Sequence, residues 1–452
     1  MYYALFLICI LSRLLYSVYY PEDIDSLRFA LSLADGYDVT RFQPHFPGYP
    51  VFCFIAYILY SISGSIALSF SMIGGVSTFL AIYFTGRILD IDIRSKAFAF
   101  TCLIILLNPM IAILGTRYMP DLMGLSIAIT SIYYIVFSST DSHKYIGFFL
   151  AGILLGIRLS YFPLVITPIA LELYRKRARL NAMLCFILGI IVWLIPFLAT
   201  QGLGNLYSVA LKHTIGHMNE YGGTIITEGS LLIRLKMLFY TVWSDGLGGY
   251  WEGRSFLTIF NSLSIVFLLS QLIKNSRIVI TSKMKVVIVS IATYALWIFL
   301  FQNIIYKSRH VLPVVYLILL VMSATYMHDK STIHYVLLLF VAIITINLSI
   351  DHRKGTAIWH LTNHLHRSQN DVVISNPLVN YYLSSNRIGA EFVSIDSLMF
   401  QEDKDFFGRN VKVVGDYSQA LSERYELSLD TIFYHNPYMN RMWSAIPLYS
   451  IK

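Results

Sequence analysis

The chain has 452 residues, of which 56% are hydrophobic and only 13% are charged, and its mean hydropathy is +0.62. This composition excludes an ordinary soluble protein and predicts a polytopic membrane protein with several bilayer-spanning helices. The formal charge of +8 indicates basic residues on the cytoplasmic side and contacts with anionic lipids rather than nucleic-acid binding.

The first apolar segment, residues 2–20, has no basic leader and no small-residue cleavage site, which favours a retained span over a signal peptide. Directly after it come Glu22, Asp23 and Asp25, followed by a helical pattern over residues 26–34. Acids beside a membrane are costly, and at the end of a helix bundle they usually have a function. The alternative is a solvated loop in which Asp23 or Asp25 only caps the following turn.

The topology follows from the basic residues between the apolar segments. Residues 51–62 are apolar but too short to span, which favours a re-entrant or interfacial helix. If residues 51–62 are not counted as a span, the positive-inside rule places three basic groups in the cytoplasm: residues 87–96, 175–179 and 274–285. We therefore predict about 11 spans, with the amino terminus cytoplasmic, the carboxyl terminus outside, and Asp25 and Asp121 on one extracytoplasmic face.

A long external segment is predicted between residues 200 and 254. It contains His213 and His217, for which solvated loop histidines are the default interpretation. Within it, residues 231–243 alternate basic and apolar side chains at helical spacing, which predicts a helix along the membrane surface.

The composition changes near Asp351, where a second domain is expected. A helical pattern over residues 356–366 precedes β-rich runs at residues 371–375, 390–395, 410–414, 430–434 and 446–451. Helical stretches near 377–383 and 418–425 separate some of them, a pattern typical of a small α/β domain. We predict a membrane domain over residues 1–350 and an extracytoplasmic α/β domain over residues 351–452.

Neither the histidine cluster of the C-terminal part nor the cysteines predict a metal site. The cluster of His360, His364 and His366 includes a helical i, i+4 pair but no third ligand, so a metal is not predicted there. The four cysteines lie in hydrophobic segments without metal-ligand spacing, and we interpret them as packing residues.

The ionisable residues expected at the outer face suggest a chemistry. They are Glu22, Asp23, Asp25, His45, Arg117, Asp121, Arg158, His213, His217, Arg309 and His310. A cavity at the outer leaflet lined by acids and arginines suits a substrate with a lipid tail and a phosphate head. A carboxylate would deprotonate an acceptor hydroxyl that attacks a sugar C1, and arginines would stabilise the departing phosphate through their bidentate fork.

The early loop resembles the first external loop of the GT-C superfamily of membrane glycosyltransferases. The likeness is carried by Asp25-Ser-Leu-Arg-Phe29, then GYDV, then QPHFPGYP, and it is greatest for the branch of protein O-mannosyltransferases and aminoarabinose transferases. These proteins carry an acid four residues before an aromatic residue; Asp25 with Phe29 fits that spacing and Asp23 does not. Ser26 stands in place of the usual second acid, and Phe46 in place of the first of two prolines.

Two further motifs extend the resemblance. RYMPD at residues 117–121 is similar to the second external loop of the superfamily with its second acid, and SRHVLP at residues 308–313 is similar to the arginine-bearing start of a late span. The small extracytoplasmic C-terminal domain is also similar to that of superfamily members.

The resemblance implies roles for particular residues. Asp25 would be the general base and the donor a polyprenyl-phosphate-linked sugar, transferred with inversion. Asp121 would orient the acceptor or hold the catalytic loop, with Asp23 as a further catalytic candidate. Arg117, Arg158 or Arg309 would receive the lipid phosphate. Glu22, His45 and His310 are the remaining substrate-binding candidates, although His45 is better explained as bracing the Pro-rich turn.

The resemblance also bears on cofactors and partners. No cofactor is expected to be required, and a divalent cation stays open because some GT-C enzymes hold one between their acids. The expected partners are the lipid-linked donor, membrane lipids and an acceptor on a lipid, a glycan or a protein. The motifs specify neither the sugar nor the oligomeric state.

Two other functions remain as alternatives. A transporter or flippase for lipid-linked glycans would predict an internal repeat with paired broken helices, and the sequence shows no such repeat. A polymerase or ligase of lipid-linked glycans would be an enzyme of another topology, and the early acidic loop argues against it.

Overall fold

The computed structural model describes residues 1–175, 179–219, 222–227, 230–279, 281–328, 331–368, 371–400, 406 and 408–452. Residues 176–178, in the middle of the basic run predicted to be cytoplasmic, lie outside the described residues. The chain divides into two compact units. The helical unit contains residues 1–18 and 28–350, and the terminal unit contains residues 19–27 and 351–452. The acidic segment after the first helix therefore belongs to the same unit as the C-terminal residues.

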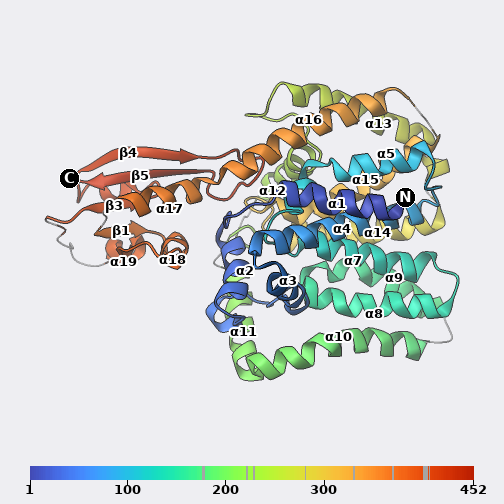
Figure 1. Ribbon diagram of the computed structural model, residues 1–452, viewed down its shortest axis with the longest axis horizontal. Helices are drawn as coiled ribbons and strands as arrows, with labels where there is room; N and C mark the ends of the chain where they lie inside the picture. The colour runs from blue at the N-terminus through green and yellow to red at the C-terminus, as the bar shows by residue number, and fades with distance from the viewer. Residues whose placement is uncertain are drawn as a thin grey trace. The chain divides into compact units, whose positions relative to one another are not determined.

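Most of the described chain is helical (Figure 1). In order along the chain, the elements up to the end of the helical unit are α1 (Tyr2–Leu15), α2 (Ile24–Ala34), η1 (Val39–Arg41), α3 (Pro50–Ser63), α4 (Ile66–Ile88), α5 (Lys96–Leu106), α6 (Pro109–Leu114), α7 (Asp121–Ile132), η2 (Tyr133–Phe137), α8 (Asp141–Ile157), η3 (Leu159–Tyr161), α9 (Phe162–Arg175), α10 (Arg179–Gln201), α11 (Leu203–Asn219), α12 (Leu231–Tyr240), η4 (Thr241–Gly246), α13 (Leu257–Val279), α14 (Ser282–Phe301), η5 (Ser308–Val311), α15 (Leu312–His328) and α16 (Ile333–Lys354).

Five helical segments within the described residues are long and apolar enough to cross a membrane, judged by length and composition. They are Ile66–Ile88, Arg179–Gln201, Ser282–Phe301, Ser308–His328 and Ile333–Arg367. Several shorter apolar helices accompany them, among them α3 with 14 residues. The chain is therefore a mostly helical, multi-pass membrane protein.

Local sequence explains where several helices begin and end. Helix α3 begins with Pro50 in its first turn and ends at Gly64, which adopts a left-handed φ of 66°. Such a residue closes a helix without the strain that a side chain would add. The next helix, α4, begins after Ser65, whose hydroxyl accepts a hydrogen bond from the amide of Leu68. This capping bond satisfies one of the amides that lack a partner within the helix.

Glycines allow some helices of the helical unit to pack at backbone contact. Helix α8 packs along α10 (Figure 1), and a Cβ added at Gly152 would lie 2.3 Å from the carbonyl oxygen of Phe186. A Cβ at Gly189 would likewise lie 2.2 Å from the carbonyl oxygen of Phe149. Small residues at such crossings are typical of membrane helix bundles.

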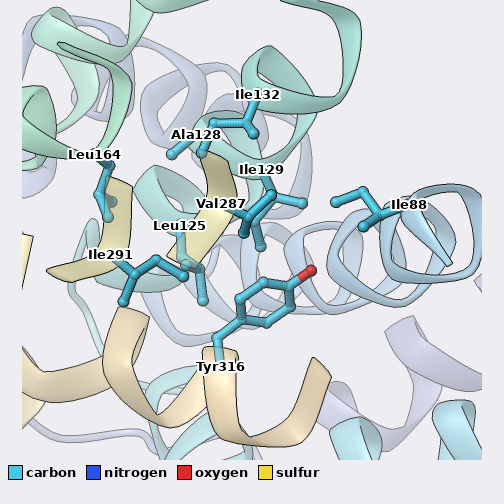
Figure 2. Close-up of a pocket in the computed structure, with 9 residues that line it drawn as sticks. All are labelled: Ile88, Leu125, Ala128, Ile129, Ile132, Leu164, Val287, Ile291 and Tyr316. Carbon is cyan, nitrogen blue, oxygen red and sulfur yellow. The ribbon is translucent and has the colours of Figure 1, made fainter. Parts of the chain in front are cut away.

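A small apolar cavity lies among α4, α7, α9, α14 and α15 (Figure 2). Its volume is about 10 Å³, roughly the space that one water molecule needs. Among its lining residues, Tyr316 carries a hydroxyl, which lies 2.8 Å from the hydroxyl of Thr85. We interpret the cavity as a packing void, because it is far too small for a prenyl chain or a sugar.

The helix predicted along the surface over residues 231–243 has a buried arginine at its centre. Arg234 is fully buried, although neighbours such as Leu232 and Leu235 are exposed. Its guanidinium donates hydrogen bonds to the carbonyl oxygens of Gly223 at 2.6 Å, Phe299 at 2.8 Å and Gln302 at 3.1 Å. A cation there satisfies carbonyls at the end of α14 and complements the helix dipole.

The terminal unit contains a five-stranded sheet in the order β2-β1-β3-β5-β4. Its elements are α17 (Ala357–Arg367), β1 (Val372–Ser375), α18 (Pro377–Ser385), β2 (Glu391–Ser394), α19 (Ile395–Phe400), β3 (Val411–Val414), α20 (Ser418–Leu421), β4 (Leu427–Tyr434) and β5 (Ala445–Ile451). Strand β1 is parallel to β2 and β3, whereas β5 is antiparallel to β3 and β4. Helix α17 packs on β4 and β5, and α18 packs on β1 and β2 (Figure 1).

Several strands of this sheet begin or end at one common edge. The carboxyl ends of β1 and β3 lie at this edge, and so does the start of β5, because Val414 pairs with Leu448 in antiparallel register. The β4–β5 connection, residues 435–444, also begins and ends there, since Tyr434 pairs with Ala445. In α/β sheets the carboxyl ends of parallel strands are the usual place for functional groups.

Candidate functional site

A buried acid–arginine cluster lies in the helical unit. Asp121 is the first residue of α7, Arg158 connects α8 to η3, and Arg309 lies in η5. The Nη2 of Arg158 is 2.9 Å from Oδ1 of Asp121, and the Nε of Arg309 is 3.7 Å from Oδ2. All three side chains are buried, and the cluster contains two guanidinium groups and one carboxylate. Guanidinium groups bind phosphate through bidentate hydrogen bonds, so two of them at one place suit an anionic ligand such as phosphate.

His310 and two tyrosines surround the Arg158 side of this cluster. The Nη2 of Arg158 lies 3.1 Å from Nδ1 of His310. A guanidinium has only donors, so the imidazole accepts at Nδ1 and carries its proton on Nε2. The guanidinium also lies over the ring of Tyr161, 5.0 Å from its centroid, and Tyr161 makes an edge contact with Tyr294. Sequence reasoning missed both tyrosines, because nothing in their local pattern separates them from ordinary core aromatics.

Asp245 is a further buried acid that sequence reasoning missed. It lies in η4, a π-helical turn that packs against η5, the turn carrying Arg309 and His310. Asn108 donates a 2.8 Å hydrogen bond to the carbonyl oxygen of Gly246 and thereby fixes the end of this turn. Single π-helical turns are often found near functional sites.

The first acidic segment lies in the terminal unit, and Asp23 is the N-cap of α2. Its carbonyl oxygen accepts from the amide of Leu27 at 3.0 Å, and its Oδ1 accepts from the amide of Ser26 at 2.9 Å. Its second oxygen, Oδ2, accepts a 3.2 Å hydrogen bond from Nδ2 of Asn440. Asp23 thus caps the turn that follows it, which is the alternative to a catalytic role for this residue.

Glu22 is also engaged within the terminal unit. Its carboxylate forms a buried ion pair and hydrogen bond with Nε2 of His352, near the end of α16. The hydroxyl of Tyr20 donates to the carbonyl oxygen of the same histidine, and the Tyr20 ring stacks on Trp359. Glu22 therefore links the loop to the helical segment that enters the C-terminal residues.

Asp25 occupies the second position of α2 and is 1% exposed. A carboxylate in the first turn of a helix is stabilised by the partial positive charge of the helix amino terminus. Phe29, four residues later, packs by ring edges against His45, Tyr49 and Phe52 in the helical unit. Along α2, Asp25 precedes Phe29 by about one helical turn.

His45 lies in the Pro-rich turn that leads into α3. Its Nε2 is 3.1 Å from the hydroxyl of Tyr49, and its ring stacks on that of His213 in α11. His213 in turn stacks on His217, whose Nε2 donates a 2.7 Å hydrogen bond to the carbonyl oxygen of Phe301. The two α11 histidines therefore lie in packed surroundings rather than in a solvated loop.

The predicted site residues fall into two sets. The helical unit brings together Asp121, Arg158, Arg309 and His310, and places the buried Arg117 in the turn before α7. The terminal unit holds the segment with Glu22, Asp23 and Asp25. Among the described residues, no group of three His, Cys, Asp or Glu side chains lies close enough together to hold a metal ion.

Comparison with solved structures bears on the fold. The chain matches ArnT from Cupriavidus metallidurans bound to undecaprenyl phosphate with a TM-score of 0.57 and 11% sequence identity, over 99% of this chain and 97% of that one. The same protein in the apo state matches with a TM-score of 0.52 and 11% identity over the same shares. The chain therefore shares the fold of ArnT. No protein-family model and no curated protein sequence matches it.

The shared fold covers 99% of this chain, and so includes the terminal unit.

Proposed function

We propose that this protein is a membrane glycosyltransferase that moves a sugar from a polyprenyl-phosphate donor to an acceptor hydroxyl on the extracytoplasmic face. One observation carries the proposal: the chain shares its whole-length GT-C fold with a protein crystallised with undecaprenyl phosphate. The buried cluster of Asp121, Arg158 and Arg309 supports it, because paired guanidinium groups suit a phosphate monoester or diester.

The proposed reaction is an inverting displacement. The acceptor oxygen attacks C1 of the donor sugar and its proton passes to the carboxylate of Asp25. The bond between C1 and the phosphate oxygen breaks, and polyprenyl phosphate leaves with the electron pair. Arg309, with Arg158 or Arg117, stabilises the phosphate, and Asp121 orients these guanidinium groups or the acceptor.

Asp25 is the preferred general base because it has the spacing from Phe29 that the GT-C resemblance requires, whereas Asp23 does not. The carboxylate of Asp23 accepts from both Ser26 and Asn440, and that of Glu22 is paired with His352, so these two acids help to hold the loop.

The proposal includes a topology. The amino terminus would be cytoplasmic, the terminal unit extracytoplasmic, and the shorter apolar helices would raise the five candidate spans toward the number of about 11 expected from the sequence. This arrangement agrees with the positive-inside rule for residues 87–96 and 274–285, and would expose the acidic loop to the compartment in which lipid-linked donors are consumed.

The proposal is tested with a variant in which the proposed general base, Asp25, is replaced. Asp25→Asn keeps the shape and hydrogen bonding of the side chain but removes the proton acceptor, so transfer should fall by a factor of about 10² to 10⁴. Purified protein in nanodiscs would be incubated with radiolabelled undecaprenyl-phosphate hexoses and pentoses and with membranes from the native host as acceptor. Transfer of label out of the glycolipid is measured.

Two variants serve as controls. Asp35→Asn removes an exposed acid just beyond the end of the same helix and should leave transfer unchanged. Asp23→Asn should cost much less than Asp25→Asn. Near-normal transfer by Asp25→Asn would refute the proposed role, and loss of transfer in Asp23→Asn alone would show that Asp23 is the base.

A further inference from the structure

The three residues that precede α2 are each bound by the C-terminal part of the terminal unit. The carbonyl oxygen of Pro21 accepts a 2.6 Å hydrogen bond from the hydroxyl of Tyr382 in α18. Glu22 pairs with His352, and Asp23 accepts from Asn440. The main chain of Pro21, the carboxylate of Glu22 and the capping side chain of Asp23 are thus held at three consecutive positions, immediately before α2.

Asn440 and a ring neighbour of Tyr382 come from the connection at the carboxyl ends of β1 and β3. Asn440 lies in the β4–β5 connection, at the same edge as the carboxyl ends of β1 and β3. Tyr382 is fully buried, and its ring makes an edge contact with Trp443 from the same connection. The edge at which an α/β domain usually binds a small ligand here binds a segment of its own chain, 417 residues away from Asn440.

The consequence for Asp25 follows from helix geometry. Asp25 is two residues beyond the N-cap, so its position is determined by where α2 begins and by the direction of its first turn. Asp23 determines where α2 begins, because its carboxylate accepts a hydrogen bond from the amide of Ser26. Asn440 in turn orients this carboxylate. A shift of Asn440 is therefore transmitted to Asp25 within the first turn of α2.

We infer that the terminal unit is a positioning device for the catalytic base, with Asn440, Tyr382 and His352 as positioning residues. The inference rests on the proposed function, in which Asp25 is the general base. These three residues act through the segment and are not themselves catalytic. Misplacement of a reacting group by about 1 Å can lower the rate by about 10²-fold, so partial release of the segment should reduce turnover without reducing donor binding.

The decisive experiment measures Asn440→Ala in two backgrounds of the full-length protein. In the otherwise native chain, the variant should lower kcat by about tenfold or more, with KM for the glycolipid donor and binding of undecaprenyl phosphate unchanged. In the Asp25→Asn background it should leave the residual rate unchanged, because there is no base left to position. A loss of folded protein would instead lower both rates by the same factor.

Asn436→Ala is the matched control. Asn436 lies in the same connection, but its Nδ2 donates to Asp351 rather than to the acidic segment. This variant should keep the native kcat. Equal losses in Asn436→Ala and Asn440→Ala, or a loss from Asn440→Ala that persists in the Asp25→Asn background, would overturn the positioning role.

Tyr382→Phe provides a variant that keeps the buried ring and removes only the hydroxyl bound to Pro21. Hydrogen–deuterium exchange should increase in the peptide covering residues 20–28 and stay unchanged in β1 and β3, and kcat should fall. An unchanged exchange rate and an unchanged kcat would refute the inference. If Asp25→Asn itself keeps native transfer, the proposed function has failed, and this result is distinct from a failure of the positioning residues alone.

Discussion

The carboxylate of Asp121 lies 2.9 Å from the guanidinium of Arg158, and the two side chains are 0% and 4% exposed. Burying two charges costs several kcal/mol for each ion, which their mutual attraction offsets only while both are present. Removal of one partner is therefore far more harmful than removal of both.

This pair gives the first prediction. Arg158→Met should destabilise the protein by about 3–5 kcal/mol, because it leaves the carboxylate of Asp121 buried with only the more distant Arg309. Adding Asp121→Asn should recover much of that loss. Thermal unfolding in detergent, followed by size-exclusion chromatography, measures both. Arg94→Met, at an exposed arginine, should change stability by no more than about 0.5 kcal/mol. A double variant less stable than Arg158→Met would contradict the prediction.

The second prediction concerns the lipid phosphate. Arg309→Ala should weaken binding of undecaprenyl phosphate about 10- to 100-fold, since hydrogen bonds to charged groups contribute about 1.5–3 kcal/mol. Arg309→Lys keeps the charge but loses the fork, so its affinity should lie between those of the native protein and the alanine variant.

Binding is measured by native mass spectrometry in the absence of any acceptor. Lys236→Ala removes an exposed cation on α12 and should leave the affinity unchanged. If Arg309→Ala and Arg309→Lys both bind undecaprenyl phosphate like the native protein, Arg309 is an interfacial anchor rather than a phosphate ligand.

The third prediction is the topology. A cysteine at Thr40, which is exposed beyond α2, should react with a membrane-impermeant maleimide in sealed cells, whereas a cysteine at Arg94 should react only after permeabilisation. The parent for both is a variant in which Cys9, Cys53, Cys102 and Cys185 are replaced, so that background labelling is removed. Equal labelling of the two positions in sealed cells would reject the orientation.

The fourth prediction tests the contact between α8 and α10. Gly152→Ala places a methyl group 2.3 Å from the carbonyl oxygen of Phe186, a contact that only backbone movement can relieve. A loss of about 1–3 kcal/mol is expected, which thermal unfolding detects. Gly204→Ala, in α11 with nothing within 4 Å of the added carbon, should have no such effect. Equal melting temperatures for the two variants would contradict the close contact.

The fifth prediction is a pH dependence in the terminal unit. Partial burial alone would raise the pKa of Asp430, but hydrogen bonds from Lys412 and Ser450 outweigh it and lower this pKa. The carboxylate therefore stabilises the folded state above its unfolded pKa of about 3.9, and this stabilisation is lost as the pH falls through the lower folded pKa.

The measurement is the difference in melting temperature between the native protein and Asp430→Asn. The native protein should be the more stable at pH 7, and the difference should shrink under acidic conditions. Asp396→Asn, at an exposed position, controls for the loss of one negative charge. If the difference in melting temperature between the native protein and Asp430→Asn grows on acidification, the prediction is contradicted.

Much of the architecture follows from local sequence patterns. Composition determines the membrane class, because long apolar helices have no other stable environment. The five strands of the terminal unit lie where the β-rich runs stand; for example, β3 (Val411–Val414) falls within residues 410–414. The spacing of Asp25 from Phe29 is likewise local. These features depend on residues that are close together in the sequence. They can therefore be predicted from the sequence alone.

The tertiary structure alone decided which distant residues meet. Asn440 contacts Asp23, and Arg158 contacts Asp121, although no periodic pattern connects the members of either pair. Arg234 shows the same limit, since its charge indicated a surface position and its hydrogen bonds to the end of α14 made it a buried residue. A buried charge or hydrogen-bonding group is stable only if the fold supplies a partner for it. That partner can lie anywhere along the chain, so only the three-dimensional structure identifies it.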